Sequence, residues 1–155
     1  MGVEGMQAQA AGDLVVLVVD DNVDAADSLR CLLELLGCTA VTAYDGPSAV
    51  QLAAQARVQL AIIDLDLPGF DGCEVLRRLK SDASLAPERA VCLTGQGRSA
   101  DRQRCLNAGF DEFWSKPLKM TDLSRALVSS QEAMRARLGQ RGAVVLDADA
   151  TERAR

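Results

Sequence analysis

Five polar residues along the chain could together carry out phosphoryl-transfer chemistry. Asp20 and Asp21 directly follow one apolar run, and Asp64 follows another. Thr94 and Lys116 end two further short runs. Crowded carboxylates repel one another unless a cation lies between them, and a set of oxygen ligands selects a hard ion such as Mg²⁺. An aspartate can attack a phosphoryl group to form an aspartyl phosphate, while an ammonium and a hydroxyl bind the phosphoryl oxygens.

The hydrophobic pattern predicts strands and helices in alternation. Continuous apolar and β-branched runs predict buried strands at 14–19, 39–43, 60–63, 90–93 and 112–115. Helical periodicity and helix-stop glycines predict helices over 24–36, 46–56, 73–80, 99–108 and from 121 to about 138. Five such repeats are typical of a parallel sheet with helices on both faces.

This sheet would position the polar residues at one edge. The carboxyl ends of parallel strands lie together, and ligands of open α/β sheets bind beyond them. The first predicted strand leads into Asp20 and Asp21, the third into Asp64, the fourth into Thr94 and the fifth into Lys116. We therefore expect three carboxylates, a hydroxyl and an ammonium to meet at that edge.

The composition excludes several functional classes. Histidine is absent from the 155 residues, which excludes histidine acid–base catalysis, Ser-His-Asp triads and histidine-ligated zinc. The 22 acidic and 17 basic residues give a net charge of −5, which argues against a nucleic-acid groove. The longest apolar run, 14–19, is too short to span a membrane, and the first 12 residues do not form a secretory signal. We expect a cytoplasmic domain with neither nucleic acid nor membrane as a partner.

Four short motifs carry a resemblance to a known family. They are Val19-Asp20-Asp21-Asn22, Asp64-Leu65-Asp66-Leu67-Pro68-Gly69-Phe70-Asp71-Gly72, Leu93-Thr94-Gly95 and Phe113-Trp114-Ser115-Lys116-Pro117. In this order, each at a predicted strand end, they resemble the receiver domain of bacterial two-component response regulators over about residues 14–127. The resemblance implies a flavodoxin-like α/β fold, a (βα)5 doubly wound parallel sheet with strand order 2-1-3-4-5 in a single domain.

The resemblance implies an acceptor and a metal site. Asp64 matches the aspartate that is phosphorylated. Asp21 matches a direct ligand of Mg²⁺ and Asp20 a partly water-mediated one, while Asp64 and the backbone carbonyl of Asp66 complete the set. Mn²⁺ is expected to substitute for Mg²⁺. The phosphodonor histidine then belongs to a partner, a histidine kinase or a histidine phosphotransfer protein, which accounts for its absence from this chain.

The resemblance also implies a switch. Thr94 and Lys116 match the hydroxyl and the lysine that bind the phosphoryl group, Phe113 matches the switch aromatic, and the bond before Pro117 is expected to be cis. In the family, phosphorylation draws the threonine inward, and the aromatic ring rotates into the vacated space. That movement biases a surface with two states.

Four residues depart from the common pattern or bear on it. Asp66, two residues after the acceptor, places an extra acid near the phosphoryl group, and Gln96 stands two residues after Thr94. We expect both to influence hydrolysis of the phosphoryl group. Phe113 lacks the hydroxyl of the commoner tyrosine, so it can signal only by packing. For Trp114 we expect a packing role.

Two other function classes remain open from the sequence. A haloacid-dehalogenase-like phosphohydrolase also uses an aspartate nucleophile in a D-x-D motif, and Asp64-Leu65-Asp66 fits that motif. That family expects Thr or Val where Pro68 stands, and its metal-binding acids follow the nucleophile. A flavodoxin-like binding module would need a phosphate-binding loop after the first strand, but that loop is acidic here. We expect no enzyme activity beyond self-phosphorylation and autodephosphorylation.

The domain organisation predicted from the sequence is simple. Residues 1–12 are expected to be a flexible leader, 13–138 the receiver domain, and 139–155 a tail that is disordered or pairs with a partner through the strand-like segment 143–146. Fewer than 30 residues follow Leu127, so output is expected through protein contact. The surface for it would combine the 100–108 helix, the Phe113 strand and the last helix. A homodimer, and an origin as a separate protein or as part of a hybrid kinase, are left open.

Overall fold

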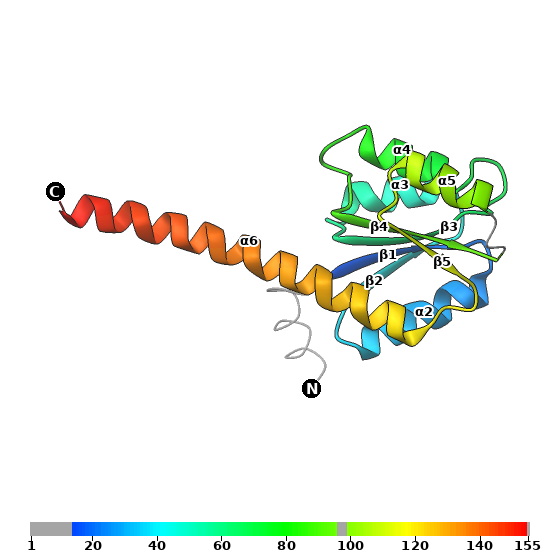
Figure 1. The fold of residues 1–155 in the computed structure, drawn as a ribbon, viewed down its shortest axis with the longest axis horizontal. Helices are drawn as coiled ribbons and strands as arrows, with labels where there is room; N and C mark the ends of the chain where they lie inside the picture. Colours follow the sequence, from blue (N-terminus) through cyan, green and yellow to red (C-terminus); the bar gives the residue numbers. More distant parts are fainter. Residues whose placement is uncertain (1–13, 96–98, 155) are drawn as a thin grey trace.

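The structure is a computed structural model that describes residues 14–95 and 99–154. It contains one sheet of five parallel strands in the order β2-β1-β3-β4-β5 (Figure 1). The predicted flavodoxin-like fold and its strand order are therefore confirmed. The predicted leader over 1–12 and Gln96 lie outside the described residues. The strands are β1 (Val15–Val19), β2 (Thr39–Ala43), β3 (Leu60–Asp64), β4 (Arg89–Thr94) and β5 (Glu112–Ser115).

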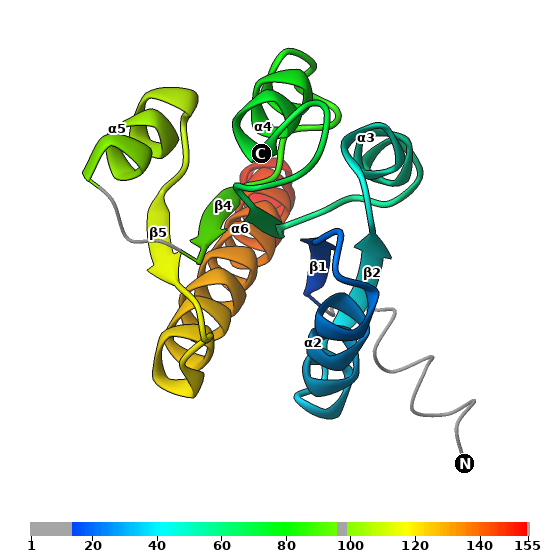
Figure 2. The same cartoon turned by 90° about the vertical axis from the view of Figure 1, so that its right-hand side faces the viewer.

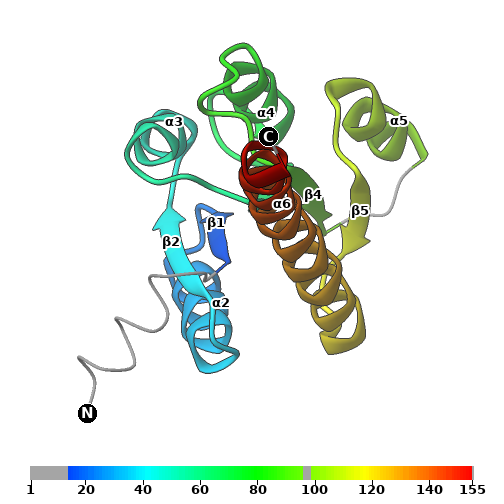
Figure 3. The same cartoon turned by 90° about the vertical axis from the view of Figure 1, so that its left-hand side faces the viewer.

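Helices cover both faces of the sheet. Figures 2 and 3 show α3, α4 and α5 on one face and α2 and α6 on the other. Alternate residues of β1 point to the two faces, so Leu17 and Val19 pack toward α3, α4 and α5, whereas Val16 and Val18 pack toward α2 and α6. The helices are α2 (Val23–Leu35), α3 (Gly46–Gln55), α4 (Gly72–Lys80), α5 (Ser99–Ala108) and α6 (Met120–Ala154).

Short polar residues fix where three of the helices begin. The side chains of Asn22, Asp45 and Asp71 accept hydrogen bonds from backbone N–H groups in the first turns of α2, α3 and α4. The end of α2 is set by Gly37, which has φ +90° and so adopts a left-handed conformation that other residues avoid. These caps place the carboxyl ends of β1 and β3 directly against helix starts.

The C-terminal helix differs from the expectation. We expected a helix to about residue 138 followed by a tail, but α6 continues to Ala154, and the segment 143–146 is helical, not strand-like. No proline follows Pro117, and the glycines at 139 and 142 each weaken a helix by about 1 kcal/mol without blocking it. The end of α6 extends away from the sheet (Figure 1). The division of the chain at residues 13–138 stays a prediction.

No helix in the described part of the chain combines the length and the apolar character that a membrane crossing requires.

Candidate functional site

Three carboxylates meet at the carboxyl edge of the sheet, as the strand ends predict. Asp20 follows β1 and Asp64 ends β3, and both are buried, with exposed fractions of 4% and 3%. Asp21 is exposed beside them. One carboxylate oxygen from each of the three lies within 4.8 Å of the other two. Burying two acids beside a third is costly, so this edge is arranged to hold positive charge.

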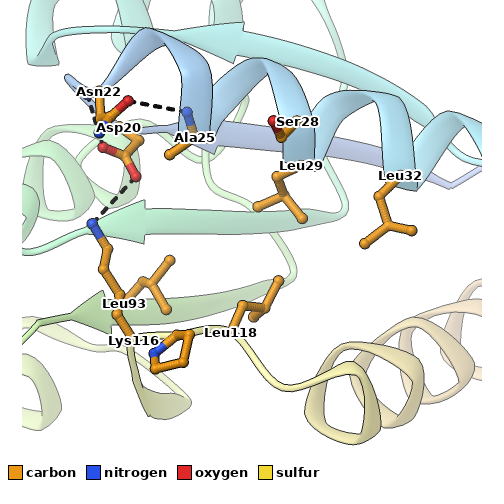
Figure 4. Close-up of a pocket in the computed structure, with 10 residues that line it drawn as sticks. Asp20, Asn22, Ala25, Ser28, Leu29, Leu32, Leu93, Lys116 and Leu118 are labelled. Carbon is orange, nitrogen blue, oxygen red and sulfur yellow. Dashed lines mark hydrogen bonds and ion pairs between the residues drawn. The ribbon is translucent and has the colours of Figure 1, made fainter.

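The two buried carboxylates are held in the same way. The Oδ1 atom of Asp20 accepts a hydrogen bond from the N–H of Asn22 at 3.0 Å, and Oδ1 of Asp64 accepts one from the N–H of Asp66 at 3.0 Å. Their Oδ2 atoms face Lys116, whose Nζ lies 3.0 Å from Asp64 and 3.4 Å from Asp20. Figure 4 shows the contact of Lys116 with Asp20. Each acid thus has one oxygen fixed by the backbone and one turned toward the ammonium.

The charges at this edge are unbalanced. Burial raises the pKa of Asp20, and the nearby charge of Asp64 raises it further against the opposing hydrogen bond from Asn22 and the charge of Lys116. Burial lowers the pKa of Lys116, but its hydrogen bond to Asp64 and the two carboxylate charges outweigh that effect and raise it overall. When all are ionised, three carboxylates and one ammonium leave two negative charges. One bound divalent cation would neutralise these two charges.

The donor set fits such a cation. All three side chains offer oxygen, and hard divalent ions such as Mg²⁺ prefer oxygen ligands. Because two of the three carboxylates are already oriented by backbone hydrogen bonds, little reorganisation is needed to share an ion. The acidic cluster can therefore bind a metal ion.

The end of β4 places the remaining two polar residues. Thr94 is fully buried at the end of this strand, and its carbonyl accepts a hydrogen bond from the N–H of Lys116 at 2.7 Å. The parallel pairing of β4 with β3 sets Leu93 beside Asp64. The structure therefore brings Thr94 and Lys116 to the same edge as the carboxylates. The Lys116–Pro117 peptide bond is cis, as expected.

Two consecutive residues of β5 face opposite sides of the sheet. Phe113 is partly buried and packs against the core on the side of α3, α4 and α5. Trp114 is buried on the side of α2 and α6, and its Nε1 donates a hydrogen bond to Glu112 at 3.2 Å. The expected packing role of Trp114 is confirmed. Phe113 lies on the face next to α5, where a movement of that helix would reach it.

Gly72 is a residue of the site that sequence reasoning did not single out. A Cβ atom at this position would lie 2.4 Å from the backbone carbonyl oxygen of Asp64, closer than any carbon can approach. Only glycine lets the start of α4 pack directly on Asp64. The available signal in the sequence was the glycine directly after the capping residue Asp71.

A groove adjoins the carboxylates. It has a volume of about 390 Å³ and runs between α2 and the segment that follows β5 (Figure 4). Asp20, Asn22 and Lys116 line its polar part. Its remaining lining residues are mostly apolar: Ala25, Ser28, Leu29, Leu32, Leu93, Pro117 and Leu118.

Known proteins share both the sequence pattern and the fold. The family model described as the response regulator receiver domain matches residues 16–128. Response regulator MprA of Mycobacterium ulcerans is 34% identical over 108 residues, which cover 70% of this chain and 46% of MprA. Sensor histidine kinase RcsC of Salmonella typhi is 29% identical over 128 residues, which cover 83% of this chain and 13% of RcsC. The chain thus spans about half the length of MprA and a small part of RcsC.

A solved structure extends the comparison to the site. The receiver domain of sensor histidine kinase PA1611 from Pseudomonas aeruginosa PAO1 is similar with a TM-score of 0.70 and 28% identity. The match covers 77% of this chain and 98% of that domain. The PA1611 receiver structure has a magnesium ion coordinated in its active-site cleft.

Proposed function

Because the chain belongs to the response regulator receiver family, we propose that Asp64 accepts a phosphoryl group from a phosphohistidine on a partner protein. This proposal rests on the burial of Asp64 and on the charged groups around its carboxylate. Asp64 is buried, its Oδ2 atom lies 3.0 Å from Nζ of Lys116, and its carboxylate lies close enough to those of Asp20 and Asp21 to share a cation. The acid therefore lies where an incoming negative group can be compensated.

The proposed transfer is an in-line displacement. An oxygen of the Asp64 carboxylate forms a bond to phosphorus while the bond from phosphorus to the histidine nitrogen breaks and its electron pair returns to the imidazole. Lys116, already 3.0 Å from Asp64, then pairs with one phosphoryl oxygen. The hydroxyl of Thr94 binds a second. The acidic cluster would hold a Mg²⁺ ion, which would supply further positive charge beside the transferred group.

The metal is proposed to be Mg²⁺, with Mn²⁺ as a substitute. Its protein ligands would be Asp20, Asp21, Asp64 and the backbone carbonyl of Asp66. The cluster of three carboxylates supports the first three assignments. The N–H of Asp66 donates a hydrogen bond to the carboxylate of Asp64, so the backbone of Asp66 lies beside the acceptor.

Asp66 is also proposed to affect the lifetime of the phosphoryl group, together with Gln96. Asp66 is exposed, and its N–H donates a hydrogen bond to Asp64, so its charge lies close to the acceptor. We expect Asp66→Asn to change the rates of phosphorylation and of autodephosphorylation by more than about twofold, because one negative charge near the phosphoryl oxygens is removed. Rates within twofold of the unmodified protein would contradict this role.

Two surfaces are proposed for the partners. The donor, a histidine kinase or histidine phosphotransfer protein, has to reach the carboxyl edge, and the largely apolar groove beside α2 offers it a contact area there. For output we propose the surface of α5, β5 and α6, where Leu106 is half exposed beside Phe113 at a cavity of about 260 Å³. Movement of Thr94 and Phe113 would link the two. We also propose that the output surface can pair two copies of the chain, which light scattering after size-exclusion chromatography would detect as a doubled mass.

One experiment tests the proposed function. The protein is incubated with Mg²⁺ and acetyl phosphate, and its intact mass is measured. We expect a gain of about 80 Da that is lost in Asp64→Asn and on chelation of the metal. The matched control is Glu34→Gln, which removes an exposed acid of α2 outside the acidic cluster and should still form the adduct.

Three outcomes would contradict the proposal. They are an adduct that persists in Asp64→Asn, no adduct on the unmodified protein, and rapid turnover of p-nitrophenyl phosphate. The last outcome would favour a haloacid-dehalogenase-like phosphohydrolase.

A further inference from the structure

Helix α5 is weakly anchored to the rest of the domain. Its buried residues are Cys105 and Ala108, both small. The neighbouring α4 buries five residues, among them Val75, Leu76 and Leu79. Because burial of large apolar side chains is the main source of helix anchoring, α5 depends more than α4 on polar contacts.

Arg104 links α5 to α4, and within α5 its Nη1 atom also lies 3.6 Å from Asp101. Its Nη2 atom lies 2.5 Å from Oδ2 of Asp71, the residue that caps α4. Its backbone carbonyl accepts a contact from Sγ of Cys73 at 3.8 Å. The other oxygen of Asp71 accepts a hydrogen bond from the N–H of Glu74 at 3.1 Å. One carboxylate therefore both starts α4 and binds α5.

The start of α4 is in turn fixed against the acceptor. The N–H of Gly72 donates to the carbonyl of Leu65 at 3.1 Å, and Gly72 packs on the carbonyl of Asp64 so closely that no side chain fits between them. A short path thus runs from Asp64 through Gly72 and Asp71 to Arg104. Every step of this path is a direct contact or a covalent bond.

We propose that the Arg104–Asp71 ion pair is a positioning link that holds α5 in the arrangement of the unphosphorylated protein. The inference rests on the proposed function, because it assigns a consequence to phosphorylation of Asp64. If the pair favours the unphosphorylated arrangement, its loss makes the rearrangement of α5 easier. By thermodynamic linkage, the acceptor site then binds a phosphoryl group more readily.

The test uses beryllium fluoride with Mg²⁺ as a phosphoryl analogue, and its affinity is measured by fluorescence of Trp114, the single tryptophan. The variants are Asp71→Asn, which keeps a capping side chain, and Arg104→Gln. Both partners are partly exposed, so we expect the analogue to bind about two- to fivefold more tightly to each variant. The double variant should bind no more tightly than Arg104→Gln alone, because Asp71→Asn removes a pair that Arg104→Gln has already removed. Arg104→Lys keeps a positive charge, so its affinity for the analogue should lie between those of Arg104→Gln and the unmodified protein.

The matched control is Arg30→Gln, which removes an equally exposed ion pair with Glu34 inside α2 and should leave the affinity unchanged. Hydrogen exchange of α5 is measured on the same samples. The link would be overturned if α5 exchanged faster in the variants while their affinity for the analogue stayed within about 1.5-fold of the unmodified protein. The ion pair would then have a structural role only. An unmodified protein that binds no beryllium fluoride would contradict the proposed function itself, and the link with it.

Discussion

Helices α4 and α5 lie side by side on one face of the sheet, yet different forces hold them (Figure 2). Val75, Leu76 and Leu79 of α4 are completely buried in the core shared with the sheet. In α5 the large apolar residue Leu106 is 47% exposed, and Arg104 makes the ion pair with α4. Apolar burial contributes about 1.5–3 kcal/mol for each such side chain, whereas an exposed ion pair contributes about 0–1 kcal/mol.

This difference matches the tasks proposed for the two helices. The start of α4 packs on the backbone of Asp64, so its rigid anchoring preserves the geometry of the acceptor. Helix α5 borders the proposed output surface, where a small free-energy change has to move a structural element. Segments with few buried apolar contacts open at lower free energy than the core. The proposed phosphoryl transfer thus lies beside the firmly packed helix, and the proposed output surface beside the loosely packed one.

The largest expected difference between the two helices is in the unfolding free energy lost when one apolar side chain of each is shortened. Leu76→Ala should lower the free energy of unfolding by about 3 kcal/mol, because it leaves a cavity in a fully buried position. Leu106→Ala should lower it by less than about 0.5 kcal/mol, since half of that side chain already contacts water. Urea unfolding followed by circular dichroism measures both. Equal losses in the two variants would show that α5 is anchored as firmly as α4.

The same contrast explains what the sequence could predict. The strands and the acids Asp20 and Asp64 were predictable because continuous apolar runs that end in an acid are local signals. Arg104 and Asp71 are separated by 33 positions, and no periodicity relates them, so their pairing could be found only in three dimensions. The extent of α6 was also missed, because two glycines resemble a helix stop although the backbone continues through them. Local sequence patterns predict the packed core, but they do not predict polar contacts between residues that are far apart in the chain.

A second test compares the local opening of the two helices. Amide hydrogens of 99–108 should exchange roughly tenfold faster than those of 72–80, because less apolar area has to be exposed to open α5. Mass spectrometry of peptides from these segments measures the rates at neutral pH. Sodium chloride at about 1 M screens the Arg104–Asp71 pair and should speed exchange in α5 more than in α4, whose buried apolar residues do not depend on salt. Equal protection of both helices at low salt would contradict the comparison.

The smallest expected effect concerns Glu112, which ties the strand beside α5 to its neighbours. Its carboxylate contacts Arg89 of β4 at 2.6 Å and Arg125 of α6 at 3.8 Å. Burial raises the pKa of Glu112, but the hydrogen bonds from Arg89 and Trp114 and the charges of both arginines outweigh burial and lower it overall. Because the pKa is lower in the folded state, ionised Glu112 stabilises the fold above the pKa of the unfolded chain. That contribution is lost as the pH falls through the folded-state value.

Glu112→Gln should therefore cost about 1 kcal/mol of unfolding free energy near pH 7, and the cost should vanish between about pH 5 and pH 2. Urea unfolding at several pH values measures it, with Glu34→Gln on the exposed face of α2 as the control that changes stability by less than about 0.5 kcal/mol at neutral pH. A cost that stays constant down to low pH would mean that Glu112 acts by packing. The ion pairs of β5 would then add no stability, and the polar support around α5 would reduce to the Arg104–Asp71 pair.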